Sequence, residues 1–119
     1  MYFGPSTADV VQLSDQLVEQ FETLSTIRVS PEAVEAATLT AYGAAFAQGD
    51  AMALALYVRR GEVAALVRLG LDRGPESALT HVVRSAVALT LARQWIPTPQ
   101  FEQAWAPFES VLGSPPRYG

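Results

Sequence analysis

The chain has 119 residues, of which 50% are hydrophobic and 17% charged, and its formal net charge is −4 at pH 7. A chain of this length forms one domain by default, and its apolar content excludes general disorder. It contains no cysteine, which excludes disulfides, thiolate catalysis and cysteine-based zinc or iron–sulfur sites.

The sequence predicts a soluble, cytoplasmic protein. Its first residues lack the basic segment and long apolar run of a secretory signal. No uncharged stretch reaches 18 residues, because Arg84 and Arg93 interrupt the best candidate, so we expect no membrane span.

Residues 7–26 are predicted to form an amphipathic helix that begins after Ser6. Large apolar residues recur every three or four positions, which places them on one side of a helix. These residues are Val10, Leu13, Leu17, Phe21 and Leu24. Such a bulky ridge suits a groove lined by small residues.

A second helix is predicted over residues 31–48. Ser30, Pro31 and Glu32 supply an N-cap, a first-turn proline and a first-turn acid, and Gly49 ends the helix. Its inward stripe is small, consisting of Val34, Ala37, Ala41 and Ala45. We therefore expect residues 7–26 to pack on it as an antiparallel hairpin.

The next stretch predicts two shorter helices, over residues 51–60 and 62–72. Asp50 caps the first helix, and Gly61 is interpreted either as the residue that ends it or as a tolerated glycine inside a longer helix. The division into two helices takes the first alternative. The alternation of large and small side chains from Met52 to Val58 would also fit a strand, but the interspersed alanines disfavour that alternative.

Residues 75–96 are predicted to be the central helix of the bundle. Pro75 and Pro97 mark its ends, and residues 85–92 carry no charge. A helix that is apolar nearly all round must be covered on more than one side. One side of this helix carries small residues, and we expect either the C-terminal helix or another subunit to cover that side.

A short C-terminal helix is predicted over residues 99–112, with a kink or break at Pro107. Its aromatic face would either fill a partner's groove or pack on its own bundle. We assign it as a candidate partner-binding face, consisting of Phe101, Trp105, Phe108 and Leu112. Residues 113–119 are rich in proline and predicted to be a flexible tail.

The sequence offers little for catalysis. His81 is the one histidine, and no carboxylate stands at helical spacing to orient it. Three carboxylates cluster at Asp15, Glu19 and Glu22, but they oppose the apolar ridge and are interpreted as a solvated face. Nucleotide-binding and hydrolase motifs are missing, so we predict no catalytic residue, cofactor or metal.

All eight basic residues are arginines, and seven of them lie in the second half of the chain. A basic surface is conceivable over residues 59–93, formed by Arg59, Arg60, Arg68, Arg73 and Arg84. It would contact nucleic acid, but the sequence pI near 4.8 gives a field that repels phosphates. Nucleic-acid binding is therefore an alternative, not the leading prediction.

The sequence thus predicts an all-α single domain over residues 1–112, a bundle of about five helices. The leading functional hypothesis is a non-catalytic interaction or assembly module that forms a homo-oligomer, because half the residues of a small chain are hydrophobic. A nucleic-acid-binding regulator is the first alternative. A small enzyme that uses His81 is the second.

Overall fold

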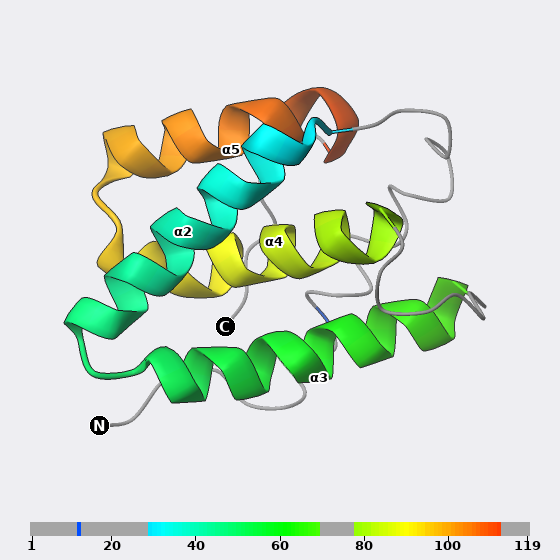
Figure 1. The fold of residues 1–119 in the computed structure, drawn as a ribbon, viewed down its shortest axis with the longest axis horizontal. Helices are drawn as coiled ribbons and strands as arrows, with labels where there is room; N and C mark the ends of the chain where they lie inside the picture. Colours follow the sequence, from blue (N-terminus) through cyan, green and yellow to red (C-terminus); the bar gives the residue numbers. More distant parts are fainter. Residues whose placement is uncertain (1–11, 13–28, 70–77, 113–119) are drawn as a thin grey trace.

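The computed structural model describes Gln12, residues 29–69 and residues 78–112. These residues form the helices α2 (Pro31–Ala47), α3 (Ala51–Leu69), α4 (Ala78–Ala92) and α5 (Thr98–Leu112), with a 3-10 turn η1 (Arg93–Trp95) before α5. The prediction of an all-α fold is confirmed for this part of the chain (Figure 1). The predicted helix over 7–26 and the tail over 113–119 lie outside the described residues. No described helix is long and apolar enough to cross a membrane.

Helix α4 is central, as its uncharged run predicts. Every residue from 85 to 92 is buried, and α4 contacts α2, α3 and α5 (Figure 1). The two polar residues in the run form side-chain hydrogen bonds to backbone carbonyls of the same helix. Ser85 donates to the carbonyl oxygen of His81 at 2.9 Å, and Thr90 donates to that of Ala86 at 2.8 Å. The interior therefore accepts both hydroxyls without an unpaired donor.

Helix α2 begins as its sequence predicts. The Ser30 hydroxyl accepts the Ala33 amide at 3.2 Å, and Pro31 occupies the first turn. The alanine stripe is fully buried, with Ala37, Ala41 and Ala45 all 0% exposed. Small side chains let two helix backbones approach closely, and among the described helices α4 makes the most extensive contact with α2.

Helix α2 ends at Gly49 with the geometry of a Schellman motif. Gly49 has φ +77°, and its amide donates to the Phe46 carbonyl at 3.0 Å. The Asp50 amide donates to the Ala45 carbonyl at 2.9 Å, and the Asp50 carbonyl accepts the Leu54 amide at 2.9 Å. The chain thus turns from α2 into α3 within three residues, and the predicted helix end at Gly49 is confirmed.

The predicted break at Gly61 is wrong, because residues 51–69 form one continuous helix. A glycine inside a helix costs roughly 1 kcal/mol relative to alanine. Gly61 is buried, one turn from the buried Val58 and two turns from the buried Leu54. Packing of this face on α4 outweighs the local cost, so the glycine stays inside the helix.

Helix α5 runs through Pro107 without a break. A proline here removes one backbone hydrogen bond and crowds the preceding turn. Phe101, Trp105 and Phe108 hold both sides of the proline in the core, with exposed fractions of 1%, 2% and 0%. The predicted split of this helix is therefore absent.

The Gly49 turn generates a stability prediction with an internal control. Gly49→Ala is expected to lower the free energy of unfolding by about 1–2 kcal/mol, because an alanine pays that penalty at positive φ. Gly43→Ala is the control, since Gly43 lies within α2 and a Cβ there meets no atom within 4 Å. It should raise stability by about 0.5–1 kcal/mol. Urea unfolding followed by circular dichroism measures both, and equal effects of the two variants would contradict the turn geometry.

Candidate interaction surface

The aromatic face of α5 is part of the chain's own core. Phe101 and Trp105 stack with ring centroids 6.2 Å apart, and Trp105 and Phe108 stack at 5.4 Å. The Arg93 guanidinium covers the Phe101 ring at 4.5 Å. All three rings are buried. They therefore pack on the chain's own bundle, as the second of the two alternatives predicts, and are not accessible to a partner. The side chain of Leu112 lies outside the described residues.

The candidate basic surface is only partly formed by the described residues. Arg59 and Arg60 are exposed on α3, and the Arg60 guanidinium lies 5.2 Å from the centroid of the Tyr57 ring. Arg84 is half-buried and paired with a carboxylate. The Arg68 side chain and Arg73 lie outside the described residues. The structure therefore brings Arg59 and Arg60 together but neutralises Arg84.

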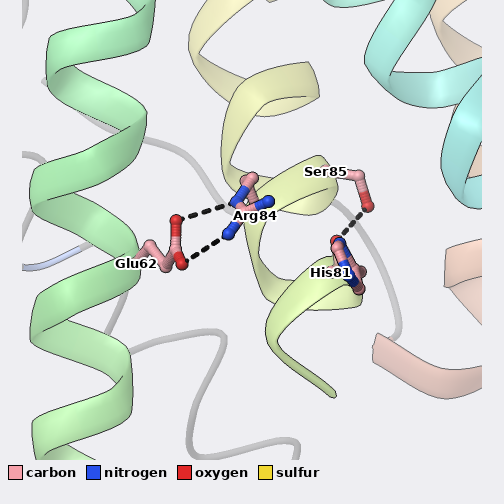
Figure 2. Close-up of polar contacts among 4 residues, drawn as sticks. All are labelled: Glu62, His81, Arg84 and Ser85. Atoms are coloured by element: carbon pink, nitrogen blue, oxygen red, sulfur yellow. Dashed lines mark hydrogen bonds and ion pairs between the residues drawn. The ribbon is translucent and has the colours of Figure 1, made fainter. Parts of the chain in front are cut away.

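The pair between Glu62 of α3 and Arg84 of α4 is the main polar contact between these helices (Figure 2). Arg84 donates through Nε to Glu62 Oε2 and through a terminal nitrogen to Glu62 Oε1, both at 2.8 Å. Two parallel charge-assisted bonds fix the relative position of the two helices as well as their charge. The partners stand 22 positions apart in the sequence, so no helical spacing reveals this pair.

A cavity of about 460 Å³ opens beside this ion pair between α2, α3 and α4. Tyr42, Arg59, Glu62 and Arg84 contribute its polar groups, and its apolar lining consists of Ala55, Val58 and Val63. Burial raises the pKa of the Tyr42 phenol above its ordinary value of 10.0; the nearby Arg84 lowers this pKa and Glu62 raises it. The cavity thus holds a carboxylate and a guanidinium that already satisfy each other.

His81 belongs to the central helix α4. It is half-buried in the first turn of α4, and its backbone carbonyl accepts the Ser85 hydroxyl (Figure 2). Within the described ranges, no group of three or more histidines and carboxylates could hold a metal ion.

Large apolar side chains are exposed along one side of α3. Met52, Leu56, Val63 and Val67, which we call the α3 row, are 84%, 58%, 52% and 76% exposed. They fall within about 60° of arc on a helical wheel. The buried residues Leu54 and Val58 occupy the opposite side of the helix. Helix α3 is therefore apolar on two sides, and only one of them meets the core.

Helix α2 also exposes two large apolar residues. Leu39 is 66% and Phe46 is 79% exposed, and their spacing of seven residues places them on the same side of the helix. Phe46 and Met52 flank the Gly49 turn in sequence. This surface is not evident from the sequence when residues 51–60 and 62–72 are taken as separate helices. The four residues of the α3 row fall on one side only when residues 51–69 form one continuous helix.

Comparison of the chain with protein-family models, curated proteins and solved structures finds no match.

Core packing of α5 predicts a large stability effect at Phe108, which is fully buried. Phe108→Ala is expected to lower the free energy of unfolding by about 3–5 kcal/mol, through lost burial and a residual cavity. Glu109→Ala, at the exposed neighbouring position, is the control and should change stability by less than about 0.5 kcal/mol. Urea unfolding measures both, and a loss below about 1 kcal/mol for Phe108→Ala would place this ring outside the core.

The environment of Tyr42 predicts a loss of stability in alkali. Because its pKa is higher in the folded state than in the unfolded state, stability is fully present below pH 10 and falls as the pH rises through the folded-state pKa. The chain has no lysine or cysteine, so between about pH 9 and 12 the tyrosines dominate its titration. Urea unfolding should show a smaller alkaline loss for Tyr42→Phe than for the wild type; an equal loss would contradict this assignment.

Proposed function

We propose that the chain is a non-catalytic interaction module that associates with itself through the exposed apolar surface of α2 and α3. This surface is defined by the α3 row together with Leu39 and Phe46. The observation that carries the proposal is the exposure of these six large side chains, each at least half accessible in the single chain. The four side chains of the α3 row share one side of one helix, and apolar patches on soluble proteins mark interaction sites.

The energies favour a partner that covers most of the surface at once. Fully burying one large apolar side chain contributes about 1.5–3 kcal/mol. Association costs on the order of 4–15 kcal/mol in lost translational and rotational freedom. One or two covered residues would not offset this cost, whereas six can. A second helix laid along α3 would cover the whole α3 row.

The two alternative functions have less support in the described residues. Arg84 is engaged by Glu62, which reduces the positive charge that the arginine-bearing half could present to nucleic acid. For an enzyme that uses a metal, the described residues supply no group of three or more histidines and carboxylates that could hold the ion. No observation favours either function over self-association.

Self-association predicts a mass that depends on concentration and on the α3 row. Sedimentation velocity of the wild type should show species larger than one chain as the concentration rises. Leu56→Glu is expected to shift the chain toward the monomer, because it places a carboxylate within the apolar surface. Leu56 is 58% exposed, so the fold should tolerate the change.

Gln103→Glu on the exposed side of α5 adds the same charge away from this surface and should leave the mass distribution unchanged. A wild type that remains monomeric at all concentrations would overturn the proposed function.

A further inference from the structure

The exposed side of α3 carries charge as well as apolar groups. Arg59 lies halfway along the α3 row in sequence, seven positions after Met52 and four before Val63. On the helical wheel it stands about 20° outside the row, at the edge that borders the cavity. Arg59 is exposed, and no hydrogen bond or ion pair joins it to another described residue. A partner that covers the α3 row and this edge therefore needs a carboxylate near Arg59, because burying an unpaired charge is costly.

The exposed side of α2 has the complementary pattern. Glu32, Glu35, Leu39 and Phe46 follow one another at spacings of three, four and seven, so they share one side of the helix. All four are exposed. This side is acidic at its N-terminal half and apolar at its C-terminal half. It carries no arginine.

The spacing of the two patterns agrees. Glu35 and Leu39 stand four positions apart. The same spacing joins Arg59 to Val63 and Leu56 to Arg60. At a rise of about 1.5 Å per residue, a Glu35 carboxylate near these arginines places Leu39 over an apolar residue of the α3 row. With Glu35 at Arg59, the two helices run in the same direction and Leu39 lies over Val63.

Two α3 rows facing each other fit less well. In an antiparallel pairing centred on the row, Arg59 of one copy would approach the arginines of the other. Like charges placed together at an interface oppose association. The α2 side of a second copy supplies both the missing carboxylates and the apolar groups.

We propose that the exposed side of α2 in one copy docks on the α3 row of a second copy, with Glu35 paired to Arg59 across the interface. This inference rests on the proposed self-association and names its contacts. A two-fold axis repeats the contact, so each copy contributes its α2 side and its α3 row once. The occupant of the α3 row is thus a second copy of this chain.

A charge-exchange experiment tests the pairing in the full-length chain. Glu35→Arg and Arg59→Glu are each expected to weaken self-association by about tenfold or more, because each places like charges at the contact. The double variant Glu35→Arg/Arg59→Glu keeps the net charge at −4 and should recover self-association. An equimolar mixture of the two single variants should also associate, because both contacts in the mixed dimer join opposite charges.

The control is Glu102→Arg/Arg59→Glu, which has the same net charge but places the new arginine on the exposed side of α5. It should remain as weak as Arg59→Glu alone. Sedimentation velocity and circular dichroism report association and folding for every variant. If the wild type associates but neither the double variant nor the mixture recovers association, the α2–α3 pairing is wrong while self-association stands. A wild type that never associates removes both.

Discussion

The whole fold depends on the burial of an uncharged run on α4. Residues 85–92 turn every side of the helix toward protein and are all buried, so at least two other elements must cover them. The alanines of α2, Leu54 and Val58 of α3, and the aromatic rings of α5 join this run in one core. Arg84, just before the run, pairs with Glu62, and Arg93, just after it, lies over Phe101. The nearest charged residues thus lie at the two ends of the uncharged run, where the chain approaches the surface.

This core uses the apolar residues of the chain unevenly. Helix α5 places all three of its large aromatic rings inside. Helix α3 places Leu54 and Val58 inside and leaves the α3 row outside. Helix α3 thus presents two apolar sides, one packed on α4 and one that is exposed in the part of the chain that the structure describes. We propose that self-association covers the second side, because burying large apolar side chains removes them from water.

The sequence predicted the features that depend on local chemistry or on missing charge. The central position of α4, the Ser30 cap and the end of α2 at Gly49 belong to this group. It failed at Gly61, where tertiary packing outweighs glycine's weak preference for a helix end. The α5 face remained ambiguous because an apolar pattern does not say whether its own core or a partner covers it. Glu62 and Arg84 meet only through the packing of α3 on α4, so helical spacing could not reveal their pairing.

Hydroxyl-radical footprinting of Met52 and Trp105, from dilute to concentrated protein, distinguishes an interface on α3 from a core that contains α5. Met52 is 84% exposed and Trp105 is 2% exposed in the single chain. The account predicts strong labelling of Met52 in dilute protein and protection as the concentration rises, with Trp105 protected throughout. Met52 labelling that does not change with concentration, or a Trp105 that becomes reactive in the dilute monomer, would contradict the assignment of α3 as the interface and α5 as the core.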